Sequence, residues 1–167
     1  MAYPVVDTTA IAHIVESLFG SPPVFILGTE NSPYLGGEYA IYAVEIEKAC
    51  RRLCVRLPRM VNGPHTSHLL SREVSIRQCI DRANVRPFQQ LITFDISYDN
   101  ALRSPYMILD WADGKPLSWT DSSPCERDCR NKVLQKVANA ALDMLSVCRS
   151  GSLPLTVLYR VITINLA

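Results

Sequence analysis

The chain has no long apolar run, no surplus of charge of either sign and no metal-binding cysteine pattern. None of its apolar stretches approaches the ~18 consecutive residues that a membrane span needs. Its first residues lack the basic segment and apolar run of a secretory leader. Seventeen basic and sixteen acidic residues leave a net charge of +1, without the basic footprint that nucleic-acid binding requires. We therefore expect a cytoplasmic protein that binds neither a membrane nor nucleic acid.

The six cysteines form no Cys-x-x-Cys pair, and no histidine lies near Cys125 or Cys129 in the sequence. Structural zinc sites combine such pairs with closely spaced histidines. In a reducing compartment, cysteines are mostly small residues of the core. A metal site in which Cys125 and Cys129 share one helix face stays open as an alternative.

The sequence contains enough apolar residues to form a core. Apolar residues make up 48% of the 167 residues and charged residues 20%, which is the profile of a globular chain rather than a disordered one. This length fits one domain or a little more. The chain is long enough to bury a modest core.

Apolar periodicity and turn residues predict the first elements. A helix is expected after Asp7 or Thr8, either of which can cap it, and Gly20 stands where a C-terminal cap belongs. Three strands are expected next, over Val24–Leu27, Tyr39–Ile46 and Arg52–Leu57.

The third expected strand alternates between two kinds of side chain. Leu53, Val55 and Leu57 point to one face, and Arg52, Cys54 and Arg56 point to the other. The strand is therefore predicted to separate an apolar layer from a face that carries an arginine.

The second half of the chain predicts more helix and strand. A helix is expected over Ser67–Ala83, strands over Gln90–Phe94 and Tyr106–Trp111, and a last helix after the capping box Ser123–Glu126. In the last helix Pro124 would be the first helical residue. Its apolar stripe consists of Val133, Leu134, Val137, Ala138, Ala141, Leu142 and Leu145. This order of elements predicts an α+β fold.

Five segments stand in an order that is specific when taken together. They are the turn Gly36-Gly37 with the strand up to Val44, the strand Cys54–Pro58 with Arg56, the helical segment Leu70–Val74 with Glu73, the stretch Ser104–Leu117 with Leu109, Asp110 and Trp111, and the last helix followed by Gly151-Ser152-Leu153. In order and spacing, from about Ile11 to Leu153, they resemble the aminoglycoside phosphotransferase family of kinase-fold proteins, especially its fungal members.

The resemblance implies roles in holding ATP. Glycines at 36 and 37 would let backbone N–H groups approach the nucleotide phosphates. Arg56 would pair with the phosphates and with Glu73, and Cys54 would pack where the adenine ring lies. The alternatives are an ordinary hairpin turn at the glycines, a surface arginine at Arg56 and a solvated helix charge at Glu73, paired with Arg77 four residues later.

The resemblance also implies a hinge between two lobes. Backbone groups of Leu109, Asp110 and Trp111 would hydrogen-bond an adenine edge, and Asp110 replaces the glutamate that is commoner in the family. The implied fold is a kinase-like N-lobe, with a five-stranded antiparallel sheet and a packed helix, then the hinge and the first C-lobe helix. The corresponding segments are 1–117 for the N-lobe and hinge, 118–153 for the C-lobe start and 154–167 for an apolar tail outside the family fold.

The family's catalytic residues have no counterparts in this sequence. The family uses a His-x-Asp-x-x-x-x-Asn loop and a later acidic ligand for Mg²⁺, but all three histidines precede the hinge and no acidic residue follows Asp143. Tyr39 and Ala40 also stand where relatives often place a small polar residue near the phosphates.

We therefore expect a truncated member of the family. Its family activity is ATP-dependent phosphorylation of a small hydroxylated substrate, and this chain is expected to be inactive alone. The alternatives are a non-catalytic binding module built on a kinase N-lobe, and a gene model whose tail derives from non-coding sequence. A nucleotide is the expected ligand, and the stripe over residues 133–145 is expected to favour self-association.

Overall fold

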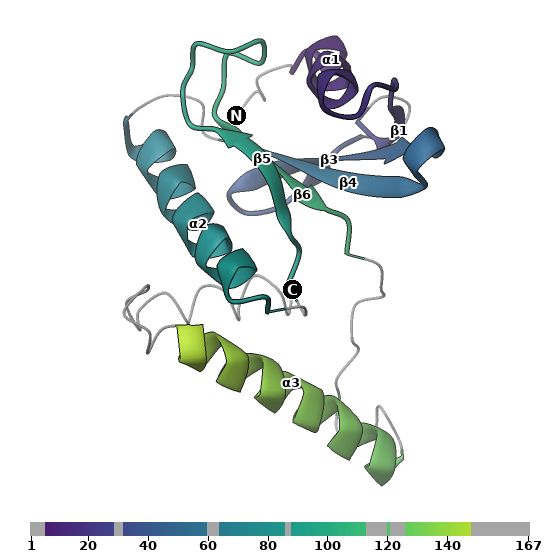
Figure 1. Cartoon of the computed structure of the whole chain (residues 1–167), viewed down its shortest axis with the longest axis vertical. Coiled ribbons are helices and arrows are strands. Elements are labelled where there is room, and N and C mark those ends of the chain that lie inside the picture. Colours follow the sequence, from purple (N-terminus) through teal and green to yellow (C-terminus); the bar gives the residue numbers. More distant parts are fainter. Residues whose placement is uncertain are drawn as a thin grey trace. The chain divides into compact units, whose positions relative to one another are not determined.

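The computed structural model describes residues 6–28, 32–59, 64–85, 88–112, 120 and 126–147. Its helices are α1 (Thr8–Phe19), the short 3-10 helix η1 (Glu47–Ala49), α2 (Pro64–Arg82) and α3 (Arg127–Val147). Its strands are β1 (Val24–Leu27), β2 (Tyr34–Leu35), β3 (Tyr39–Ile46), β4 (Arg51–Pro58), β5 (Leu91–Asp95) and β6 (Tyr106–Asp110). The chain is α+β, as its sequence predicts (Figure 1).

The strands form one antiparallel sheet. Their order is β1-β3-β4-β6-β5, and β2 also pairs with β3. β1 pairs with the C-terminal half of β3, where Val24 lies opposite Glu45, while β2 pairs with the N-terminal half, where Tyr34 lies opposite Ile41. β1 and β2 are therefore two pieces of one edge. The sequence prediction missed β2 because two residues are too few to show a strand period.

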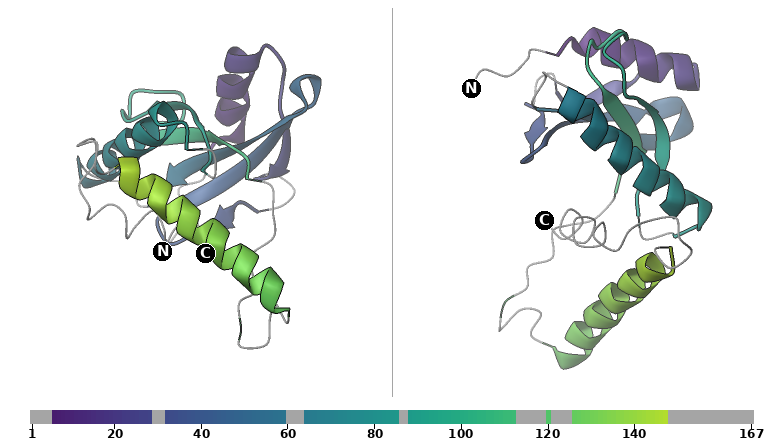
Figure 2. Two further views of the ribbon diagram at one scale, coloured as in Figure 1. Left: turned by 60° about the horizontal axis from the view of Figure 1, so that its bottom comes forward. Right: turned by 90° about the vertical axis from the view of Figure 1, so that its left-hand side faces the viewer.

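The predicted alternation in β4 is confirmed, and it places different layers on the two faces of the sheet (Figure 1 and Figure 2). Leu53, Val55 and Leu57 pack in one buried cluster with Ile11 and Val15 of α1. On the other face, Cys54 packs with Leu70 and Val74 of α2. Two of the interior strands, β4 and β6, are therefore covered on both faces, and this buries the polar groups in their middle.

Local chemistry decides where the helices begin and end. Asp7 caps α1 by accepting from the amide of Thr9 at 2.9 Å, and Gly20 ends the helix in the left-handed conformation, as predicted. α2 begins at Pro64 rather than Ser67, because proline suits the first helical position, where no N–H is needed.

The start of α3 also differs from the expectation. α3 begins at Arg127, and the carbonyl of Glu126 accepts its first helical bond from the amide of Arg130 at 3.0 Å. The expected cap residues Ser123, Pro124 and Cys125 lie outside the described residues. Three members of the predicted apolar stripe, Leu134, Val137 and Leu142, are exposed. Self-association through this stripe stays a prediction.

By its internal contacts the chain divides into two compact units. One consists of Met1–Arg77 with Gln89–Trp111, and the other of Gln78–Phe88 with Ala112–Ala167. The expected boundary after residue 117 and the separate tail 154–167 stay predictions. The sheet and the site described below belong to the first unit.

Gly28 lies directly after β1, where the edge of the sheet formed by β1 and β2 is interrupted, and a substitution there tests the structure of this edge. Its φ is +119°, and a Cβ there would overlap the ring of Tyr42. We expect Gly28→Ala to lower the free energy of unfolding by about 1–3 kcal/mol, since the strained backbone and the clash add. Gly37→Ala is the control, because Gly37 has no positive φ and open space around its Cα. Urea denaturation measures the free energy of unfolding of both variants. Equal losses in the two variants would contradict the strained backbone of Gly28 and its close approach to Tyr42.

Candidate functional site

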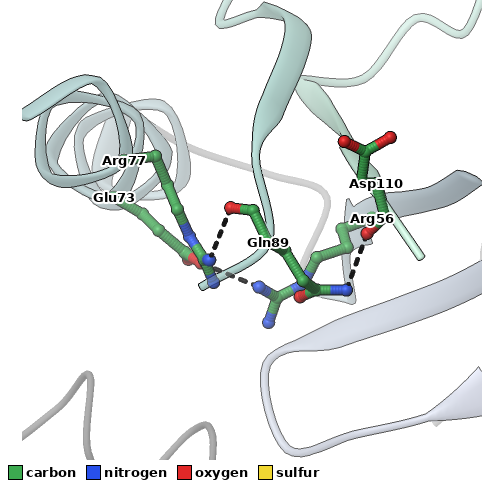
Figure 3. Close-up of polar contacts among 5 residues, drawn as sticks. All are labelled: Arg56, Glu73, Arg77, Gln89 and Asp110. Atoms are coloured by element: carbon green, nitrogen blue, oxygen red, sulfur yellow. Dashed lines mark hydrogen bonds and ion pairs between the residues drawn. The ribbon is translucent and has the colours of Figure 1, made fainter. Parts of the chain in front are cut away.

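Arg56 and Glu73 form a buried ion pair between the sheet and α2. Arg56 Nη1 lies 2.8 Å from Glu73 Oε1, and the two side chains are 9% and 15% exposed. Glu73 reaches the sheet because its helical neighbours Leu70 and Val74 hold α2 against the face that carries Cys54 and Arg56. The predicted meeting of these two side chains is confirmed (Figure 3). Neither is a solvated surface charge.

Tyr39 covers the guanidinium of Arg56. The carbon Cζ of Arg56 lies 4.6 Å from the centroid of the Tyr39 ring, a distance at which a cation is attracted by the π face. Burial raises the pKa of the Tyr39 phenol well above its usual range, and the charge of Glu73 and a hydrogen bond to it raise the pKa further. Tyr39, Arg56 and Glu73 therefore form one buried cluster.

One donor of Arg56 is left over in this cluster. Its Nε is buried and has no hydrogen-bond partner among the residues that the structure describes. A buried donor without an acceptor costs about 1–3 kcal/mol, so such a group in a native fold calls for an explanation. An acceptor supplied by a bound anion is one that suits a guanidinium, because arginine binds phosphate and carboxylate oxygens well.

Arg77 shares the carboxylate of Glu73 with Arg56. Arg77 Nη2 lies 3.8 Å from Glu73 Oε1, one helical turn away, and Arg77 Nη1 donates to the carbonyl of Gln89 at 3.4 Å. The Arg77 side chain is only 4% exposed, so the i,i+4 pairing considered from the sequence is present but buried. Sequence reasoning treated it as the alternative to the strand pairing, whereas the fold brings both arginines to one carboxylate.

Gln89 connects α2 to the end of β6. While its carbonyl accepts from Arg77, its side-chain amide donates to the carbonyl of Asp110 at 2.9 Å (Figure 3). The carboxylate of Asp110 is held by Arg51, whose Nη2 and Nε lie 2.6 and 2.7 Å from Oδ1. Sequence reasoning missed Gln89 and Arg51, and no local pattern marks either residue.

The residues of the predicted hinge use most of their backbone groups within the protein. Leu109 is buried and lies opposite Cys54 in β4 and Leu91 in β5. The amide of Asp110 donates to Gln90, and the amide of Trp111 donates to the carbonyl of Arg52, both at 3.0 Å. The expected adenine contacts of these amides would have to replace existing bonds. The carbonyl of Asp110 is likewise taken by Gln89.

The turn Gly36-Gly37 connects β2 to β3 and is a closed hairpin turn. The amide of Gly36 donates to the carbonyl of Tyr39 at 2.9 Å, and Arg59 Nη1 donates to the carbonyl of Gly36 at 2.6 Å. The amide of Gly36 is therefore not free for a phosphate in this conformation. At Gly37, no positive φ and no close neighbour requires glycine, so the fold does not explain the residue at that position.

Cys54 lies in the same buried layer as Tyr39. Burial, more than any charge, raises the pKa of its thiol from about 9.0 to about 11. Cys54 is thus a protonated apolar residue at neutral pH and not a nucleophile.

The chain matches no protein-family model, no curated protein and no solved structure. Within the described ranges, no helix is long and apolar enough to cross a membrane. The same residues hold no group of three His, Cys, Asp or Glu side chains that could bind a metal ion. The interpretation of the site therefore depends on the geometry of its own residues.

The buried ion pair predicts a large effect on stability. Because Glu73 serves two buried arginines, we expect Glu73→Leu to lower the free energy of unfolding by about 3–5 kcal/mol. The matched control is Glu45→Leu, which removes the partner of Arg52 at 3.4 Å in a pair whose side chains are 50% and 36% exposed; it should cost about 1 kcal/mol or less. Chemical denaturation measures both. A similar small loss in both variants would show that the Glu73 pair is not buried in solution.

The raised pKa of Cys54 predicts a loss of stability in alkali. The unfolded thiol ionises near pH 9.0 and the folded thiol near 11, so the unfolded state releases its proton first as pH rises. The stabilisation is complete below pH 9 and is lost towards pH 11. We expect the free energy of unfolding to fall by about 1 kcal/mol between pH 9 and 10 from this group. Cys54→Ala should flatten that slope, and an unchanged slope would contradict the burial of the thiol.

Proposed function

We propose that the first unit is the nucleotide-binding lobe of an aminoglycoside-phosphotransferase-like kinase fold, in which Arg56 holds the phosphates of ATP. The family activity that this supports is ATP-dependent phosphorylation of a small hydroxylated substrate. The observation that carries the proposal is the buried pair of Arg56 and Glu73 at 2.8 Å. Kinase-fold enzymes orient their phosphate-binding cation in the same way, with a glutamate from a helix.

The positions of the two residues in the chain support this proposal. Arg56 lies in β4, in the middle of an antiparallel sheet, and Glu73 lies in α2, the helix that directly follows that strand. β6 pairs with β4 and then leads into the hinge-like segment after Asp110. A strand cation, a following helix glutamate and a neighbouring strand that ends at the hinge together make up the N-lobe arrangement that the resemblance implies.

The residues around Arg56 offer some of the contacts that ATP would need, but not all of them. The Nε of Arg56, which has no partner among the described residues, is a donor that a phosphate oxygen would satisfy. Gly37 lies in the turn that precedes Tyr39, and no described atom lies within 4 Å of the position that a Cβ would take there, which would allow a ligand to approach the backbone closely. Adenine recognition would fall to hinge groups other than the amides of Asp110 and Trp111, since both are bonded internally.

The Mg²⁺ of the family does not fit the described residues, which hold no acidic cluster for it. The sequence also has no His-x-Asp-x-x-x-x-Asn loop to position a nucleophile. The proposed role of this chain is therefore to bind the nucleotide, and no step of phosphoryl transfer is assigned to its side chains.

Nucleotide binding tests the proposal. We expect ATP to bind in isothermal titration calorimetry, and Arg56→Met to weaken that binding about tenfold or more, because a charged hydrogen bond to phosphate is lost. Arg52→Met is the matched control, since Arg52 lies on the same strand, with its Nε 3.4 Å from Glu45 and half of its side chain exposed; it should leave the affinity unchanged. We expect no ATP-dependent transfer to an aminoglycoside or another small polyol by the purified chain.

Two results would overturn the proposal. One is the absence of ATP binding by the folded wild-type chain. The other is an equal affinity for ATP in wild type and in a folded Arg56→Met variant, which would place the nucleotide elsewhere.

A further inference from the structure

Tyr39 lies beside Arg56 on the face of the sheet that α2 covers. It is the first residue of β3 and follows Glu38 after the turn at Gly36-Gly37; it lies opposite Pro58, while Ile41 lies opposite Arg56. Tyr39 and Arg56 are thus diagonal neighbours on one face of the sheet, within reach of an aromatic and a long side chain.

The contacts of Tyr39 occupy both partners of the ion pair. Its ring lies 4.6 Å from the guanidinium carbon of Arg56, and its hydroxyl is hydrogen-bonded to Glu73. Tyr39 and Arg56 are each only 7% exposed. The cation is therefore shielded on its Tyr39 side by an aromatic ring, while no described residue supplies an acceptor for its Nε.

Building on the proposed nucleotide site, we propose that Tyr39 controls the access of phosphate to Arg56 and so sets the affinity of the site for polyphosphate ligands. With the ring in place, the π face of Tyr39 takes the position of an anionic ligand beside the guanidinium. A bound phosphate would have to displace the ring, and this displacement weakens binding.

The exchange is chemically reasonable for these groups. A charged hydrogen bond between guanidinium and phosphate is stronger than a cation–π contact, and it would give Nε an acceptor, which no described residue supplies. Displacement of the ring has to break the packing of Tyr39 in the layer that contains Cys54 and Leu70. The carbonyl of Tyr39 also accepts from the amide of Gly36 at 2.9 Å, so a movement of Tyr39 that opens this bond would free the amide of Gly36.

Two substitutions separate the ring from the hydroxyl. Tyr39→Ser removes the ring, and Tyr39→Phe keeps the ring but removes its bond to Glu73. Calorimetric titration with ATP and with inorganic tripolyphosphate gives the affinity of each full-length chain, and circular dichroism reports whether the variant is folded. We expect Tyr39→Ser to bind about fivefold to tenfold more tightly than wild type, and Tyr39→Phe about twofold to threefold more tightly.

The comparison of the two ligands, together with a second substitution at Arg56, identifies the cause of the expected gain in affinity. Tripolyphosphate should show the same gain as ATP, because Tyr39 acts on the phosphate end of the ligand. Combining Tyr39→Ser with Arg56→Met should abolish the gain. If Tyr39→Ser does not fold, the comparison of Tyr39→Phe with wild type decides, since that variant keeps the ring and loses only the bond to Glu73.

Each outcome discriminates between the two proposals. Equal affinity of wild type and the folded Tyr39 variants, with binding still weakened by Arg56→Met, overturns the role of Tyr39 and keeps the nucleotide site. A gain with ATP that is absent with tripolyphosphate overturns the phosphate-access role. No binding of either ligand by any folded variant overturns both the nucleotide site and the role of Tyr39.

Discussion

The guanidinium of Arg56 is a full charge buried in the middle of a sheet, and the arrangement around it follows from that. A buried charge is tolerated only with an opposite charge and hydrogen bonds nearby. Glu73 supplies the charge at 2.8 Å and Tyr39 supplies an aromatic face at 4.6 Å. α2 must therefore lie across β4 at one rotation, with Glu73 turned towards the strand.

The same requirement extends through α2 to the end of β6. Arg77 joins the carboxylate of Glu73 and also holds the carbonyl of Gln89, whose side chain then holds the carbonyl of Asp110. Arg51 fixes the carboxylate of Asp110. A continuous set of hydrogen bonds and ion pairs thus leads from the strand cation to the hinge-like segment. It holds the carbonyl of Asp110 within the protein, and the amides of Asp110 and Trp111 are bonded separately to the carbonyls of Gln90 and Arg52.

The apolar layers make this polar layer possible. On the opposite face of the sheet, Leu53, Val55 and Leu57 pack with α1 in a wholly apolar cluster. Burial of that kind supplies most of the favourable free energy of folding. The α2 side can therefore retain an arginine whose Nε has no acceptor among the described residues, a feature that native folds keep mainly at sites where another group binds.

The sequence alone determined the α+β class, the alternation in β4 and the caps Asp7 and Gly20 of α1, because periodicity and capping depend on residues close together in the chain. The meeting of Arg56 with Glu73 was predicted through a family resemblance, and the fold confirmed it. Only the tertiary structure decided that Arg77, Gln89, Arg51 and Tyr39 join this cluster. Their partners are brought together by the register of β3, β4 and β6 and by the rotation of α2, which depend on packing across the whole sheet.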